Sequence, residues 1–242
     1  PDEIDQVSSR GYAMGYIGGS TIPLVASIAL IMLEPKVGIA SELAVRISFL
    51  LVAAWWAVFT IPMLRHVKQK YWVEPDAQPI RSSLRRIART LRNIAGYRAI
   101  FVFLAAYFFY IDGVGTIIHM ATVYGDSVGI SGNMLLGALL FIQIVAFPFA
   151  IIYGKLAERV GAYRMILVGI GVYIVVCILG YRMQTALDFW VLGFLVATSQ
   201  GGIQALSRSF YGKLVPAEHA NEFFGFYDIF GKFAAILGPT LF

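Results

Sequence analysis

Residues 189–209 read FWVLGFLVATSQGGIQALSRS and determine how the rest of the chain is interpreted. The stretch begins as an apolar run and continues without interruption into two glutamines, three serines and an arginine. On a helix, residues at i, i+4, i+7 and i+8 share one face, so Gln200, Gln204, Ser207 and Arg208 are predicted to form one polar face. A lipid-facing helix does not tolerate such a face, so it must meet protein or water.

The composition of the whole chain indicates a membrane protein. Of its 242 residues, 59% are hydrophobic and only 14% are charged, which excludes an ordinary soluble domain. The first residues are polar instead of signal-like and the last ones lie in an apolar run, so we interpret the chain as an internal fragment. The single cysteine, Cys177, can form no intrachain disulfide.

Seven stretches are long and apolar enough to cross a bilayer, which takes roughly 20 mostly apolar residues. We therefore predict an all-α integral membrane helical bundle. The predicted spans are residues 11–33, 46–64, 100–124, 134–154, 164–181, 189–208 and 223–242.

The net charge of +5 follows this topology and does not indicate nucleic-acid binding. All but four of the 19 Lys and Arg residues lie on one side of the predicted membrane, which the positive-inside rule makes the cytoplasmic side. No asparagine begins an N-x-Ser/Thr sequon, which is compatible with a bacterial inner membrane. We expect a multi-pass monomer in contact with lipid, with no nucleic-acid partner and no cofactor.

The longest connection, residues 65–99, contains the sequence PIRSSLRRIARTLRNIAGYR from Pro79 onward. Its apolar residues repeat every three or four positions and its arginines lie opposite, as in a basic amphipathic helix on the cytoplasmic leaflet. We interpret this connection as a strap that joins two units, residues 1–64 and 100–242.

Two of the predicted spans contain closely spaced glycines. Gly11, Gly15 and Gly19 recur every four residues in the first span, where we expect them to let another helix approach closely. In the third span, Gly113 and Gly115 follow the acidic position 112 and are expected to let the helix break there.

Polar residues lie near the middle of four spans. An ionised carboxylate at this depth costs about 2.5–3.5 kcal/mol, so Asp112 must face protein or water. A rise of about 1.5 Å per residue puts Asp112, Gln143, Gln200 and Lys232 each roughly 14–18 Å from one end of its span. We therefore predict that the four meet at the midplane. His119 shares the face of Asp112.

The last span leaves two pairings open. Asp228 and Lys232 are spaced i, i+4 and can pair with each other. Alternatively, Lys232 meets Asp112 or a substrate anion across a cavity. At the cytoplasmic mouth, Arg208 is expected to pair with Glu222 or Glu218, whereas Gly201 and Gly202 are expected to serve close packing.

Residues 154–164 read GKLAERVGAYR and resemble the cytoplasmic signature of the major facilitator superfamily, G-x-L-A-D-R-x-G-R-R. The sequence departs from that signature at Glu158, where aspartate is usual, and at Ala162 and Tyr163, where basic residues are usual.

Four further stretches are similar to the autophagy-associated vacuolar effluxer family and its bacterial relatives, a branch of that superfamily. They occur in order over nearly the whole chain. They are VSSRGYAMGYIGG at 7–19, AYFFYIDGVGTI at 106–117, QGGIQALSRS at 200–209 and EFFGFYDIFGKFAAILGP at 222–239.

The resemblance implies a twelve-helix transporter with two six-helix halves, of which this chain holds about helices five to eleven. Residues 1–64 are then the last two helices of the first half, residues 65–99 the central loop, and residues 100–242 helices seven to eleven. The second and fifth predicted spans become peripheral helices. The resemblance also suggests amino-acid efflux by alternating access, with no enzymatic activity.

Two groups of residues are predicted to carry this function. At the midplane, Lys232 would take a substrate carboxylate, Asp112 an ammonium group or a proton, and Gln143 and Gln200 would orient the substrate; this site comprises Asp112, His119, Gln143, Gln200, Gln204, Asp228 and Lys232. At the cytoplasmic face, Glu158 is expected to approach the start of the first span, where Ser8 and Ser9 cap free N–H groups. This gate comprises Ser8, Ser9, Arg10, Gly154, Glu158, Arg159, Gly161 and Arg208.

Three other functions remain open at this point. Seven spans with a lysine in the last one also fit a seven-helix receptor or a retinal protein. A membrane scaffold without transport would leave the midplane residues without a purpose. An intramembrane enzyme is disfavoured because the three histidines are scattered and no paired nucleophile and base appear.

Overall fold

The helix that carries the opening sequence is the core of the molecule. In the computed structural model, which describes residues 3–38, 40–68, 96–216 and 220–241, α8 spans Ala186–Leu214. It begins at a reciprocal cap, in which Thr185 Oγ1 accepts from the Asp188 backbone N–H at 3.2 Å and the Asp188 carboxylate accepts from the Thr185 N–H at 2.9 Å. Half of its most apolar segment is buried, the largest share of any described span.

Every regular element among the described residues is a helix. The first span is one continuous helical run in three sections, with a π-helical section, η1, in its middle. The elements are α1 (Ile4–Met14), η1 (Gly15–Thr21), α2 (Ile22–Val37), α3 (Ser41–His66), α5 (Arg98–Ser127), α6 (Gly132–Val160), α7 (Ala162–Gly180), α8 (Ala186–Leu214) and α9 (Ala220–Leu241).

Six helical runs in the described part of the chain are long and apolar enough to cross a membrane. Most of them extend the predicted spans by a few polar residues at each end, since a helix does not stop where the apolar sequence stops. The seventh predicted span forms α9, but α9, which contains Asp228 and Lys232, is not among the six.

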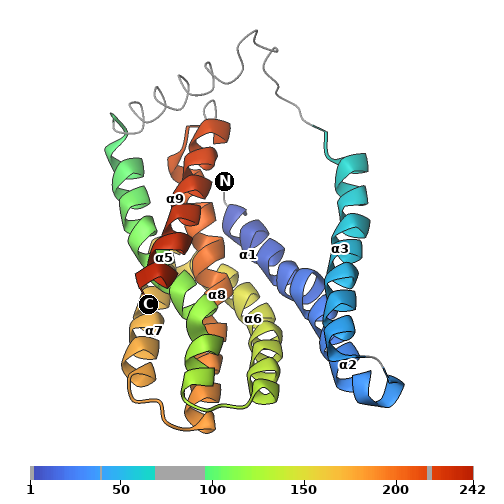
Figure 1. The fold of residues 1–242 in the computed structure, drawn as a ribbon. Coiled ribbons are helices and arrows are strands. Elements are labelled where there is room, and N and C mark those ends of the chain that lie inside the picture. The colour runs from blue at the N-terminus through green and yellow to red at the C-terminus, as the bar shows by residue number, and fades with distance from the viewer. Residues whose placement is uncertain (1–2, 39, 69–95, 217–219, 242) are drawn as a thin grey trace.

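Most of the helices gather around α8, whereas α2 and α3 form an arm at one side (Figure 1). α6 and α7 pack against α8, α5 pairs with α9, and α1 crosses both α6 and α8. The end of α3 and the start of α5 lie at the same end of the bundle (Figure 1). The predicted amphipathic strap falls largely on residues 69–95, outside the described residues, so the division into two units stays a prediction.

Glycines on the buried side of α8 allow the close packing that the sequence predicts. A Cβ atom at Gly201 would lie 2.7 Å from the Tyr16 ring, and one at Gly202 would lie 2.1 Å from the Tyr153 ring. Only a bare backbone fits these positions. The prediction that Gly201 and Gly202 serve close packing is confirmed.

An aromatic cluster attaches α9 to α5 and α8. The ring of Tyr227 on α9 stacks with Tyr107 on α5 at 4.3 Å between centroids and with Tyr211 on α8 at 5.1 Å. The Tyr211 hydroxyl donates to the Phe223 carbonyl at 2.9 Å. The burial of several large rings supplies the packing energy that holds α9 in place.

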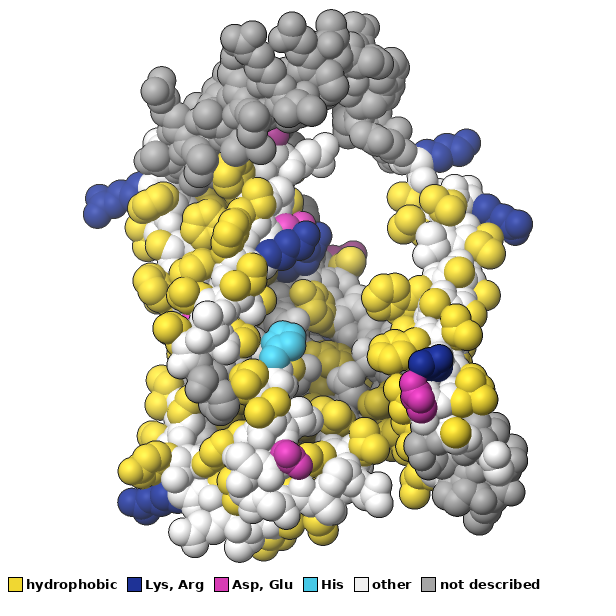
Figure 2. All heavy atoms as spheres, in the orientation of Figure 1, with side chains coloured by type: hydrophobic (Ala, Val, Ile, Leu, Met, Phe, Trp, Pro, Cys, Tyr) yellow, Lys and Arg dark blue, Asp and Glu magenta, His cyan; other side chains and the backbone are white. Residues whose placement is uncertain are grey.

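Two helices lie at the periphery, as predicted for the second and fifth spans. α3 packs against α2, and the Trp55 indole N–H donates to the Gly18 carbonyl at 2.9 Å. Large apolar side chains of α3, among them Phe49 and Trp56, are exposed (Figure 2). α7 buries one stripe against α8 and leaves its other face open.

One expectation about glycine is wrong. α5 runs unbroken through Gly113 and Gly115, because a helix tolerates isolated glycines when its neighbours hold it in place. The stripe of Gly11, Gly15 and Gly19 has no neighbour among the described residues, since a Cβ atom at any of the three would meet nothing within 4 Å. Its close approach to another helix stays a prediction.

Candidate functional site

A cavity lies between the first helical run and the polar face of α8. Its volume is about 580 Å³, within the range of small-molecule sites. Three elements line it: α1 with η1, α6 and α8. The lining residues are Val7, Ser8, Gly11, Tyr12, Gly15, Tyr16, Ser20, Gln143, Gln200, Gln204 and Arg208.

The wall from α8 consists of Gln200, Gln204 and Arg208, at intervals of four residues. Gly201 and Gly202 pack α8 against the rings of Tyr16 and Tyr153, while the side chains of Gln200, Gln204 and Arg208 line the cavity. Ser207, predicted to belong with them, is fully buried and forms a 2.6 Å hydrogen bond with the Tyr110 hydroxyl of α5.

The facing wall comes from the glycine-rich start of the first helical run. Gly11 and Gly15 have no side chains to fill the space, which makes room for a ligand. Tyr12 and Tyr16 supply hydroxyl groups to the same cavity as the Gln200 side chain. The π-helical section begins within this wall, and such sections are frequent at functional sites.

The third wall is Gln143 of α6. The sequence predicted from depth alone that Gln143 and Gln200 meet, and both line the cavity. Glutamine side chains offer both donors and acceptors. The middle of the cavity is therefore suited to a polar ligand of either hydrogen-bonding character.

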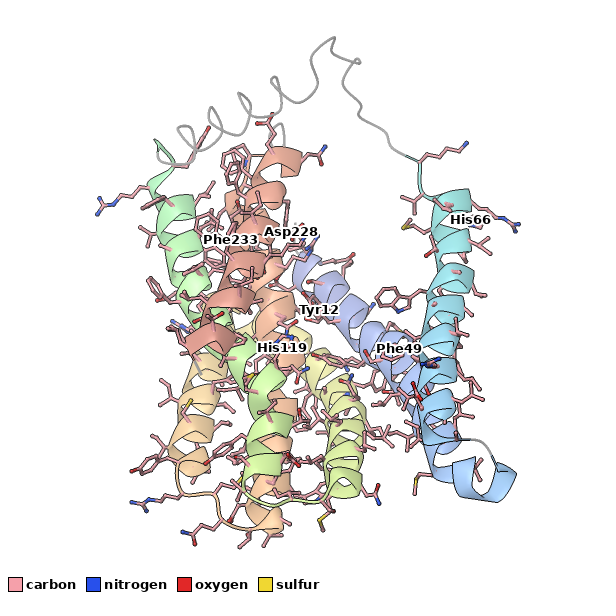
Figure 3. The ribbon with its side chains drawn as sticks, in the orientation of Figure 1. Tyr12, Phe49, His66, His119, Asp228 and Phe233 are labelled. Carbon is pink, nitrogen blue, oxygen red and sulfur yellow. The ribbon has the colours of Figure 1, made fainter. Side chains whose placement is uncertain are left out.

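Arg208 carries the charge of the cavity and pairs with α9. Its Nη1 lies 3.8 Å from Oδ1 of Asp228, and its guanidinium lies 5.2 Å from the centroid of the Phe224 ring. The expected pairing of Arg208 with Glu222 or Glu218 is not the one seen, and Glu218 lies outside the described residues. Figure 3 shows Asp228 on the side of α9 that faces α1, near Tyr12.

Asp112, His119 and Lys232 do not line this cavity. Asp112 is half-buried, and its Oδ1 accepts a hydrogen bond from the Gly238 backbone N–H at 2.7 Å. His119 is exposed, with Nδ1 2.6 Å from the Gly115 carbonyl (Figure 3). Lys232 is exposed on α9. Their predicted roles in substrate or proton binding stay predictions.

At the cytoplasmic end, α1 is joined to α8 by an ion pair that the sequence reading missed. Lys213 Nζ lies 2.6 Å from Oδ2 of Asp5, whose side chain is only 5% exposed. Asp5, Ser9 and Ala13 are the buried residues of α1. Their spacing of four residues is the signal that identifies this face.

The predicted gate residue Glu158 contacts α1 through Gln6. The Gln6 amide donates to the Glu158 carboxylate, and Arg10 donates to the Gln6 amide oxygen at 2.8 Å. The expected capping by Ser8 and Ser9 is wrong, because α1 begins at Ile4 and both serines lie beyond its first turn.

The other gate residues have structural contacts of their own. Ser8 Oγ donates to the Ala205 carbonyl at 2.7 Å, and Ser9 packs against Gly154, where a Cβ atom would lie 2.7 Å away. Gly161, with φ of 96°, ends α6 and precedes α7. Arg159 borders a shallow surface pocket together with Gln6 and Glu158.

No group of three or more His, Cys, Asp or Glu side chains suited to a metal ion occurs among the described residues. The cavity is lined by amide and hydroxyl groups and by the Arg208 guanidinium, which can bind a polar solute by hydrogen bonds and ion pairing.

Comparisons with known proteins identify the family of the chain. The sequence pattern of the family described as "Vacuole effluxer Atg22 like" matches residues 2–242. The chain is 56% identical over 237 residues to the MFS-type transporter YxiO of Bacillus subtilis. The aligned region covers 97% of this chain and 55% of that protein.

More distant relatives are fungal. The chain is 24% identical over 268 residues to autophagy-related protein 22-1 of Penicillium rubens, covering 98% of this chain and 43% of the relative. It is 25% identical over 268 residues to autophagy-related protein 22-2 of Aspergillus clavatus, covering 98% and 42%. The chain thus spans about half the length of the curated relatives it matches. No solved structure matches it.

Proposed function

This chain belongs to the Atg22-like vacuole effluxer family, and from that premise we propose that it is part of a secondary active transporter for a small polar solute. Its six apolar helical runs and its similarity to a bacterial protein make it a multi-pass integral membrane protein of the bacterial plasma membrane. The name of the Bacillus subtilis relative favours transport over a receptor, a retinal protein or a scaffold.

The observation that carries the proposal is the polar cavity of about 580 Å³ between α1–η1, α6 and α8. Polar groups inside a membrane are costly unless they serve a ligand, an ion or water. Gln143 of α6 and Gln200 and Gln204 of α8 are three such polar side chains within membrane-spanning helices. We assign to them the orientation of a substrate by hydrogen bonds.

Alternating access gives the remaining contacts a function in this proposal. The Asp5–Lys213 and Gln6–Glu158 contacts hold the cytoplasmic ends of α1, α8 and α6 together. Breaking them would open the cavity toward the cytoplasm, as rocking of two bundles around a central site requires. For the direction we propose efflux, in line with the family's description. For the substrate we propose an amino acid, and coupling to protons is part of the same proposal.

Counterflow with the reconstituted full-length protein tests the function. Proteoliposomes are loaded with unlabelled amino acids, sugars or organic anions, and uptake of the labelled solute is followed. We expect exchange of amino acids only. Absence of exchange with every solute would contradict a transporter.

Variants of the cavity test the site itself. Gln143→Ala and Gln200→Ala each remove a hydrogen bond worth about 1 kcal/mol, so the half-saturating solute concentration should rise five- to tenfold. Gln184→Ala is the matched control, because Gln184 is exposed outside α8. Equal effects of the three variants would show that the cavity is not the binding site.

A further inference from the structure

One charged side chain, Arg208, lies among the residues that line the cavity in the described part of the chain. A solitary charge in a membrane cavity would select ions of opposite sign. Arg208 is not solitary, however, because Asp228 of α9 lies 3.8 Å from it. The Asp228 carboxylate offsets part of the arginine charge at this end of the cavity.

The Arg208–Asp228 pair is loose. The two side chains are 49% and 56% exposed, and an exposed pair at this separation contributes little to stability. A guanidinium has five N–H donors and a carboxylate about four acceptor sites, so both groups keep unused hydrogen-bonding capacity. Separating them costs little, and each can accept a new partner.

The surroundings of the pair keep the arginine in place when the acid moves away. The guanidinium lies over the Phe224 ring at 5.2 Å, a cation–π contact that fixes its direction. Tyr12 lines the same cavity as Arg208. Gln204, one turn before Arg208, faces the same cavity.

We propose that Arg208 and Asp228 form a subsite for the zwitterionic head of an α-amino acid, which inserts between them. The substrate carboxylate takes the guanidinium as a bidentate partner, and the substrate ammonium group takes the Asp228 carboxylate. The substrate side chain then extends toward Gln143 and Gln200. This subsite rests on the proposed transport function and names the substrate class of the same cavity.

The arrangement discriminates against ligands with only one of the two charges. A carboxylic acid without an amino group displaces Asp228 and leaves its carboxylate without a partner. An amine without a carboxylate leaves the guanidinium without one. Each loss is that of one charge-assisted hydrogen bond, which corresponds to roughly 10- to 100-fold in affinity.

The test uses proteoliposomes of the full-length protein and a labelled mixture of the common α-amino acids. The amino acid taken up best is competed with its decarboxylated amine and with its deaminated acid. Both analogues should compete about 10- to 100-fold more weakly than the amino acid. Competition by either analogue as strong as that by the amino acid overturns the subsite.

Two variants assign the two charges. In Arg208→Gln, the affinity for the amino acid should fall 10- to 100-fold, whereas the affinity for the amine should not change. In Asp228→Asn, the affinity for the amino acid should fall, whereas the affinity for the deaminated acid should not change. Arg208→Lys should restore part of the loss. A uniform change for all three ligands would indicate a structural role and overturn the assignment.

The outcomes separate this subsite from the transport function. Exchange of a sugar or an organic anion, without any amino acid, overturns the subsite and leaves a transporter. Exchange of no solute contradicts both. Because Arg208 and Asp228 are half exposed, both variants should fold, which elution as a single peak in detergent checks.

Discussion

Two ion pairs on α8, separated by little more than one helical turn, are built in opposite ways. Lys213 lies 2.6 Å from Asp5, which is 5% exposed, whereas Arg208 lies 3.8 Å from Asp228, and both members of that pair are about half exposed. A short contact to a buried carboxylate is costly to break, and a long contact between exposed groups is not. The first pair therefore holds helices together, and the second can exchange partners.

The largest effect is expected from removing the buried contact. Lys213→Met leaves the Asp5 carboxylate buried without its cation, which should lower the free energy of unfolding by about 3 kcal/mol. Arg208→Met, the same replacement five residues earlier, should change it by less than about 0.5 kcal/mol. Thermal unfolding of the full-length protein in detergent measures both.

Neutralising the acid gives the matched control. Asp5→Asn combined with Lys213→Met removes the uncompensated charge and should recover most of the lost stability. Equal losses from Lys213→Met and Arg208→Met, or no recovery in the double variant, would remove the distinction between the two pairs.

Two glycines differ in the same way: Gly202 packs tightly against another helix, whereas Gly15 borders the cavity. Gly202→Ala would place a methyl group 2.1 Å from the Tyr153 ring, and such overpacking costs about 1–3 kcal/mol. Gly15→Ala meets open space and should not lower stability. It should instead weaken solute binding by filling the cavity. Unfolding midpoints and counterflow affinities test the pair, and a loss of stability from Gly15→Ala alone would contradict it.

The sequence predicted the helices and part of the site, because both depend on patterns along one helix. Gln200, Gln204 and Arg208 share a cavity face as their spacing requires. Ser207 departs from it, because the Tyr110 hydroxyl of α5 provides a buried partner. No pattern on α8 alone could reveal that partner.

Contacts between helices were harder to predict. Depth gave the level of each polar residue but not the direction in which it points, so Gln143 joined Gln200 whereas Asp112 turned toward α9. Asp5 was missed because the first span was expected to begin at residue 11. The glycine stripe was assigned to packing, since a bare helix face fits a neighbour and a cavity equally well.

Asp112 is a further charged residue that either holds helices together, as Asp5 does, or exchanges partners, as Asp228 is proposed to do. Its carboxylate accepts from the Gly238 N–H at 2.7 Å, and a Cβ atom at Gly238 would lie 2.7 Å from the same oxygen. This contact fixes the crossing of α5 and α9, so Asp112, like Asp5, holds two helices together. Asp112→Ala should then lower stability by about 1 kcal/mol, whereas Asp112→Asn keeps an acceptor oxygen and should change it less.

The sequence-based hypothesis predicts a different result for the same variants. If Asp112 carries a proton and Lys232 takes a substrate carboxylate, Asp112→Asn should abolish the pH dependence of uptake, and Lys232→Ala should weaken binding tenfold or more. If Asp112 only positions α9, Asp112→Asn transports with an unchanged pH profile, and Lys232→Ala, which removes an exposed charge outside the cavity, leaves affinity within about twofold. Uptake measured from pH 5 to 8 on the two variants therefore distinguishes two cases. Either Arg208 and Asp228 alone exchange ion-pair partners during transport, or Lys232 and Asp112 also bind substrate or a proton.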